Sequence, residues 1–279
     1  MTATTTHGRP PGDDTAGFRP VSVEPGSLEG AFGETVPAVR ARADPARRSD
    51  RWFRYARVSL GVSAVAGVGL LVVGNADPLN EMLSDAVRTV PGALLLMVAA
   101  CGLAVSGMWL LAGVRRALPR ARAVSWLLGV WCASLVAVAF FPTNLPGTEP
   151  GTTAVVHRVG AALMAALPPL IALLVAEAAG RRAEADRAGF LGPGGQVEAA
   201  RPGQLNPAAR VEAGRVRLLR AAGLAALAAC VAFGVAHVPA VLFGVELFPY
   251  AGLAERILLA LVLVVVGLCA WAVEGVERE

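Results

Sequence analysis

The chain has 279 residues, of which 55% are hydrophobic and 16% charged, a balance too apolar for a soluble domain of this length. Its net charge is +4, and its 25 basic residues are all arginine. No nucleic-acid-binding module and no pattern of aromatic residues between the arginines accompanies this charge, so we expect no nucleic-acid partner. The composition predicts a protein inserted in a membrane.

Six long apolar stretches follow one another along the chain. A helix needs about 20 mainly apolar residues to cross roughly 30 Å of hydrocarbon, and each stretch has about that length. Because the apolar runs are not interrupted by alternating polar residues, they predict helices and not the strands of a barrel. We therefore expect an all-α, polytopic bundle of six transmembrane helices, with spans at about residues 58–76, 90–114, 123–141, 153–179, 218–238 and 253–273.

The arginines predict the orientation of the bundle, because basic loops are retained on the cytoplasmic side of a membrane. If the N-terminus is cytoplasmic, all arginines lie on that side except Arg88, Arg158 and Arg256. We therefore expect a multi-pass protein of the bacterial plasma membrane with both termini in the cytoplasm.

The segments outside the spans differ in composition. Residues 1–50 contain few large apolar residues, which predicts a disordered cytoplasmic tail. Residues 51–275 form the predicted transmembrane domain, and within it the polar segment 180–215 is expected to be a flexible cytoplasmic loop. A short cytoplasmic tail, 276–279, ends the chain. The first apolar run begins too far from Met1 for a cleavable signal sequence.

Two features of the spans bear on chemistry. The four cysteines all fall within apolar stretches, so we expect no disulfide, no metal site and no cofactor. The fourth stretch contains Pro168 and Pro169, which lack the amide donor for the carbonyls of Met164 and Ala165. A kink is therefore expected there.

Polar and ionisable residues gather instead at the predicted extracytoplasmic ends of the helices, around the proline- and glycine-rich loop 142–151. His157 and Glu255 are the candidates for acid–base catalysis. The spacing of the histidines does not place two metal ligands on one helix. A structural polar cap and recognition of a ligand are the other interpretations. The candidate ligand-binding residues are Asn144, Glu149, His157, Arg158, His237, Phe243, Glu246, Glu255 and Arg256.

A family resemblance rests on three pieces of sequence. Phe141-Pro142-Thr143-Asn144 is followed by His157 at the start of the fourth span, and the segment Gly252-Leu253-Ala254-Glu255-Arg256 opens the sixth. This order resembles the six-helix prokaryotic membrane proteins known as domain of unknown function 998, over about residues 58–273. The resemblance implies a six-helix bundle with an outer polar motif and no established reaction. Family members usually carry Asp at the position of Asn144, which implies that this acid's role is lost here or moved to Glu149.

Three functions stay open at this stage. The leading hypothesis is a protein that binds a lipid or amphiphile at its extracytoplasmic face, between the kinked fourth helix and the apolar segment around Phe243. The alternative is a membrane enzyme that acts on a lipid or isoprenoid-like substrate. A small-molecule permease is a third, disfavoured because the middle of the spans holds no Asp, Glu, Arg or His. The expected partners are membrane lipids, and the small residues of the helices permit a homo-oligomer or a membrane-protein partner.

Overall fold

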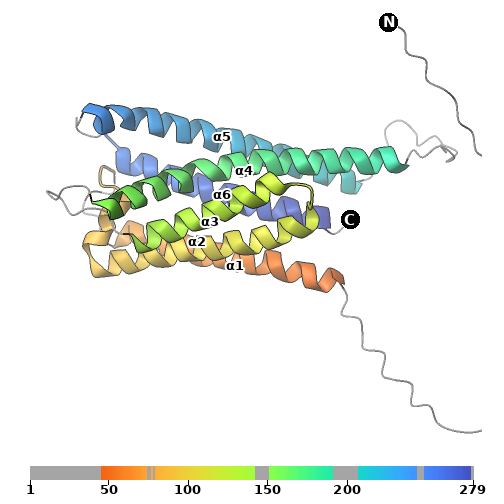
Figure 1. Cartoon of the computed structure of the whole chain (residues 1–279), viewed down its shortest axis with the longest axis horizontal. Helices are drawn as coiled ribbons and strands as arrows, with labels where there is room; N and C mark the ends of the chain where they lie inside the picture. The colour runs from red at the N-terminus through yellow and green to blue at the C-terminus, as the bar shows by residue number, and fades with distance from the viewer. Residues whose placement is uncertain are drawn as a thin grey trace, which may run out of the picture. The chain divides into compact units, whose positions relative to one another are not determined.

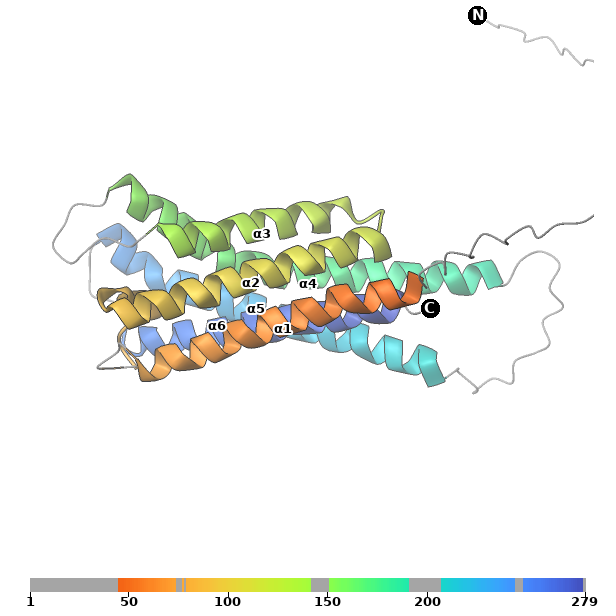
Figure 2. The same cartoon turned by 90° about the horizontal axis from the view of Figure 1, so that it is seen from below.

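The computed structural model describes residues 45–73, 77, 79–141, 151–190, 207–243 and 248–277. In this part of the chain six α-helices and a 3-10 helix follow one another: α1 (Pro45–Val72), η1 (Leu83–Arg88), α2 (Val90–Ala117), α3 (Arg122–Phe140), α4 (Thr152–Phe190), α5 (Pro207–Phe243) and α6 (Ala251–Glu277). The α-helices lie side by side in one bundle (Figures 1 and 2). All six are long and apolar enough to cross a membrane, which confirms the predicted all-α architecture of six long apolar helices.

The helices extend further than the predicted spans at one end of the bundle. α1 begins at Pro45, and its apolar window is Arg51–Val72, so it both starts and ends before the expected 58–76. α4 and α5 occupy parts of the segment 180–215 that was expected to be loop. These extensions are rich in alanine, the best helix former. The expected disordered tail lies outside the described residues, except for its last turn, 45–50, which is helical.

Small residues allow α1 and α2 to pack closely. The hydroxyl of Ser63 donates a hydrogen bond to the Ala99 carbonyl over 2.9 Å, and that of Ser106 donates to the Ala56 carbonyl over 2.9 Å. A Cβ at Gly102 would collide with the Ser63 hydroxyl. Close approach of small residues is the usual way in which helices associate in a membrane, where apolar burial gives no preference for protein over lipid.

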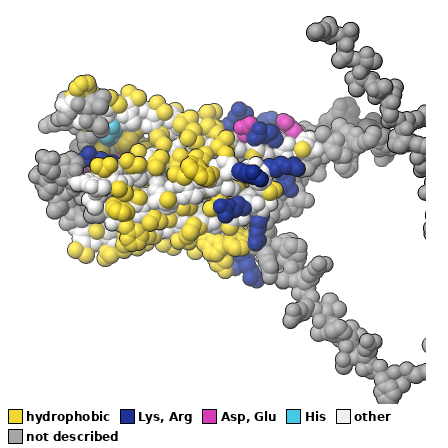
Figure 3. All heavy atoms as spheres, in the orientation of Figure 1, with side chains coloured by type: hydrophobic (Ala, Val, Ile, Leu, Met, Phe, Trp, Pro, Cys, Tyr) yellow, Lys and Arg dark blue, Asp and Glu magenta, His cyan; other side chains and the backbone are white. Residues whose placement is uncertain are grey.

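Polar contacts join the helices at the end of the bundle where the arginines lie. Figure 3 shows most of the basic side chains of this face gathered at this end and hydrophobic side chains across its middle. Here Arg57 of α1 forms an ion pair with the buried Glu274 of α6 at 2.9 Å. The guanidinium of Arg116 lies 4.8 Å from the ring centre of Trp52, which itself lies 4.9 Å from the ring of Trp109. We call this the arginine-rich end.

A buried tryptophan links α3 to the proline pair of α4. The indole Nε1 of Trp131 donates a hydrogen bond to the Met164 carbonyl over 3.0 Å. That carbonyl is the one to which Pro168 cannot donate, because proline has no amide hydrogen. The fully buried ring fits against Gly107 of α2, where a Cβ would lie 2.8 Å from it. α3 therefore supplies the donor that α4 lacks.

Candidate functional site

At the end opposite the arginine-rich end, the segment before α2 packs onto the start of α6. The Glu255 carboxylate accepts a hydrogen bond from the Leu83 amide over 2.6 Å, and the Arg256 guanidinium donates one to the Glu81 carbonyl over 2.9 Å. Gly252 lies so close to the same carbonyl that a Cβ there would collide with it. Two of the predicted ligand-binding residues, Glu255 and Arg256, thus hold a loop of the protein in place.

A tight turn continues this contact. The carboxylate of Asp77 accepts hydrogen bonds from the Leu79 amide over 3.1 Å and from the Asn80 side-chain amide over 2.6 Å. The Asn80 side-chain oxygen in turn accepts from the Tyr250 amide over 3.0 Å, and the Leu253 amide donates to the Leu79 carbonyl over 2.9 Å. The hydrogen bond from the Asn80 side chain, followed by that from the Leu79 amide, lowers the pKa of Asp77 below its ordinary value. This turn is fastened to the residues that lead into α6.

The two histidines of the bundle occupy separate places. Nδ1 of His157, which is 4% exposed, donates to the Phe141 carbonyl at the end of α3 over 2.7 Å. Nδ1 of His237 donates to the Phe233 carbonyl one turn earlier in α5 over 2.8 Å, and its ring lies 5.2 Å from that of Phe248. Within the described part of the chain, no hydrogen bond or ion pair joins either histidine to the other or to a carboxylate. His157 and Glu255, the pair predicted for acid–base catalysis, therefore share no hydrogen bond or ion pair in this part of the chain.

The other predicted ligand-binding residues are dispersed or fall outside the description. Arg158 is exposed on α4, and Phe243 is exposed at the end of α5. Asn144, Glu149 and Glu246 lie outside the described residues. Among the residues that the structure describes, no three His, Cys, Asp or Glu side chains come together as a set of metal ligands.

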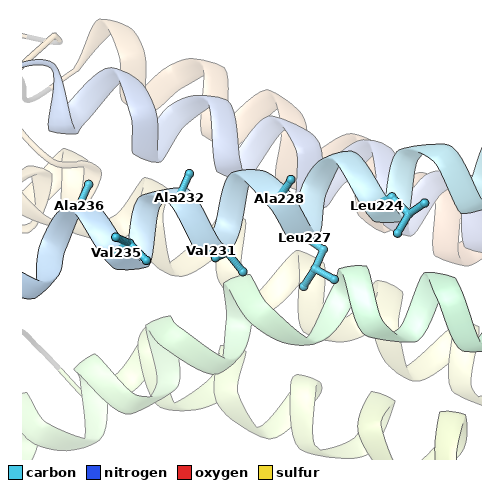
Figure 4. Close-up of a pocket in the computed structure, with 7 residues that line it drawn as sticks. All are labelled: Leu224, Leu227, Ala228, Val231, Ala232, Val235 and Ala236. Atoms are coloured by element: carbon cyan, nitrogen blue, oxygen red, sulfur yellow. The ribbon is translucent and has the colours of Figure 1, made fainter.

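A hollow along α5 was not predicted from the sequence. It is an open groove of about 780 Å³, and the side chains that line it are all apolar (Figure 4). In α5 only 17% of the apolar window is buried inside the protein, against 50% in α6, so this helix turns most of its surface outward. The residues that line the groove are Leu224, Leu227, Ala228, Val231, Ala232, Val235 and Ala236.

The groove divides α5 into two faces. At 3.6 residues per turn, Phe243 lies two turns beyond Ala236 and therefore on the groove side, where it is 75% exposed. His237, packed against Phe233 and Phe248, lies on the opposite side. His237 and Phe243 are both among the predicted ligand-binding residues, although their separation of six residues places them on different sides of a helix.

A sequence signal for the groove was present. Ala228, Ala232 and Ala236 recur at every fourth residue, with Val231 and Val235 beside them. Small residues at this spacing leave a shallow depression on a helix surface. The sequence does not reveal that the depression faces outward, because residues 221–236 are apolar on every side of the helix.

The six apolar helices and their packing define a polytopic, α-helical membrane protein. Residues 58–195, from within α1 to just beyond α4, match the family described as Protein of unknown function (DUF998). This match confirms, over these residues, the resemblance stated from the sequence. The Gly252 to Arg256 segment lies outside the matched residues. No curated protein and no solved structure matches the chain.

Proposed function

We propose that this protein binds a lipid or another amphiphile in the membrane, with an acyl chain lying along α5. The observation that carries this proposal is the open apolar groove between Leu224 and Ala236. Twelve residues of helix rise about 18 Å, which is close to half of the roughly 30 Å hydrocarbon core and hence to the length of one acyl chain. A groove lined only by apolar side chains suits a hydrocarbon chain and offers no polar side chain to a soluble ligand.

The polar residues at the end opposite the arginine-rich end are less available to a ligand than the sequence predicts. Glu255 accepts a hydrogen bond from the Leu83 amide, and Arg256 donates one to the Glu81 carbonyl. His157 donates one to the Phe141 carbonyl. These contacts stabilise loops and a helix end. We therefore place the ligand along α5. Of the predicted ligand-binding residues, Phe243 lies at the end of this groove.

The same contacts bear on the enzyme hypothesis. An acid–base pair needs two groups within reach of the same substrate atom. His157 and Glu255 each bond to a different backbone group, so a binding role is better supported than catalysis by this pair. We further propose that the arginine-rich end faces the cytoplasm of a bacterium, because 22 of the 25 arginines belong to the tails, loops and helix ends on that side of the predicted topology.

Retention of lipid during gentle purification tests the proposal. Val231→Trp fills the middle of the groove, and Val65→Trp places the same bulk on α1, where Val65 is 73% exposed and is not one of the residues that line the groove. Native mass spectrometry should find a retained amphiphile on the wild-type protein and on Val65→Trp, and a strongly reduced amount on Val231→Trp. Equal retention by all three proteins would refute the proposal. A change of oligomeric state confined to Val231→Trp, without loss of lipid, would also refute it and make the groove a contact between proteins.

A further inference from the structure

A second, more enclosed hollow lies between α4 and α5 toward the arginine-rich end. It has a volume of about 280 Å³, and its apolar wall includes Leu173 of α4 and Val216 and Leu224 of α5. Two charged residues, Glu177 and Arg220, also line it. The hollow thus combines an apolar interior with ionic groups, unlike the groove farther along α5.

The charge available to a ligand in this hollow is positive. Glu177 is already paired with Arg181, one turn later on α4, at 3.1 Å. Arg220 is exposed and forms no ion pair or hydrogen bond with any residue in the described ranges. Its guanidinium is therefore free to bind an anion, and a guanidinium donates two parallel hydrogen bonds to a phosphate.

The two hollows adjoin each other. Leu224 lines both, so the path from Arg220 passes Leu224 and continues along the groove to Ala236. Sixteen residues of helix rise about 24 Å. A cation at one end and an apolar path of this length match the shape of a phospholipid, which carries its phosphate at one end of a hydrocarbon chain.

We infer that the amphiphile is an anionic phospholipid whose phosphate binds Arg220 and whose acyl chain follows the hollow between α4 and α5 into the groove. This inference rests on the proposed function and adds the class of the headgroup and the end of the bundle at which it binds. The headgroup lies at the arginine-rich end, opposite to the face expected from the sequence. Charge complementarity favours this occupant, because an anionic phospholipid keeps a net negative charge to pair with Arg220, whereas the cation of a zwitterionic headgroup offsets the charge of its own phosphate.

The experiment compares two arginines of α5. Arg220 lines the hollow, whereas Arg217 is exposed one turn earlier and lines neither hollow. The wild-type protein, Arg220→Gln, Arg217→Gln and Arg220→Lys are placed in nanodiscs of phosphatidylcholine and phosphatidylglycerol and then extracted gently. Mass spectrometry of the released protein gives the ratio of the two retained lipids.

The wild-type protein and Arg217→Gln should retain phosphatidylglycerol in excess of its share of the bilayer. The enrichment should be about fivefold lower in Arg220→Gln, which corresponds to about 1 kcal/mol for one arginine at an anionic lipid surface. Arg220→Lys should keep most of it, because the charge remains. Equal losses in Arg217→Gln and Arg220→Gln, or no loss in either, would overturn the inference. If Val231→Trp still abolishes retention in that case, the proposed function stands and only the headgroup assignment fails.

Discussion

Trp131 offers the sharpest test of how the bundle is held together. Its indole nitrogen lies 3.0 Å from the Met164 carbonyl, which Pro168 leaves without a helical donor. The change Trp131→Phe keeps an aromatic ring at this position and removes the donor. The ring also becomes smaller, so the single variant combines a lost hydrogen bond with a cavity.

A double-mutant cycle separates these two effects. Pro168→Ala restores an amide hydrogen four residues after Met164, and this amide can donate to the carbonyl within α4. The indole donor is then no longer needed, whereas the cavity left by Trp131→Phe is the same. Interhelical hydrogen bonds in membrane proteins contribute about 0.6 kcal/mol on average and up to roughly 1.7 kcal/mol. An unsatisfied buried carbonyl costs about 1–3 kcal/mol, so we expect a coupling energy of about 1–2 kcal/mol.

The free energy of unfolding of the four proteins is measured in mixed micelles by titration with a denaturing detergent. Trp131→Phe should destabilise the protein less when Pro168→Ala is present than in the wild-type background, by the coupling energy. If Trp131→Phe lowers the free energy of unfolding by the same amount in both backgrounds, the hydrogen bond to Met164 contributes nothing and the reasoning is refuted.

Three further predictions concern other contacts. Gly107→Ala should lower the free energy of thermal unfolding by about 1–3 kcal/mol, because the new Cβ would lie 2.7 Å from the Cys132 sulfur. Gly129→Ala is the control and should not lower it, because a Cβ there has no neighbour within 4 Å. Glu255→Ala should speed amide hydrogen exchange in η1 and Glu255→Gln much less, since the glutamine oxygen can still accept; equal exchange rates would contradict the docking role. Asn80→Ala should raise the pKa of Asp77 toward its ordinary 3.8 in an NMR titration. In the wild-type protein the ionised carboxylate stabilises the turn fully above pH 3.8, and this stabilisation is lost as the pH falls through the lowered pKa. In Asn80→Ala the stabilisation should be lost at a higher pH than in the wild-type protein.

Hydropathy was sufficient to predict the number of long apolar helices, because a run of roughly 20 apolar residues is typical of a membrane-spanning helix and of few other structures. The ends of α4 and α5 were not predicted, because hydropathy marks where a helix leaves the hydrocarbon and not where it stops being helical. Alanine-rich segments such as 180–190 continue as helix beyond that point.

The site depended on contacts that no local pattern specifies. Proline chemistry predicted that the Met164 carbonyl would lose its donor, but only the packing of α3 against α4 shows that Trp131 replaces it. The carboxylate of Glu255 was identified as a chemical group, and its partner, the Leu83 amide, is 172 residues away in the sequence. Ionisable side chains at helix ends can cap the backbone or bind a ligand, and their neighbours decide which of these roles they take.

Photocrosslinking tests the central claim, that an acyl chain occupies the groove of α5, most directly. The protein is reconstituted with a phospholipid that carries a diazirine on its acyl chain, irradiated and digested, and the labelled residues are mapped by mass spectrometry. The exposed valines of α1, Val65, Val68 and Val72, serve as the internal control for contact with bulk lipid. We predict that label on residues 224–236 exceeds that on the α1 valines and is competed by unlabelled phospholipid. Equal labelling of the two helices, unaffected by competitor, would contradict the claim and make α5 an ordinary lipid-facing helix.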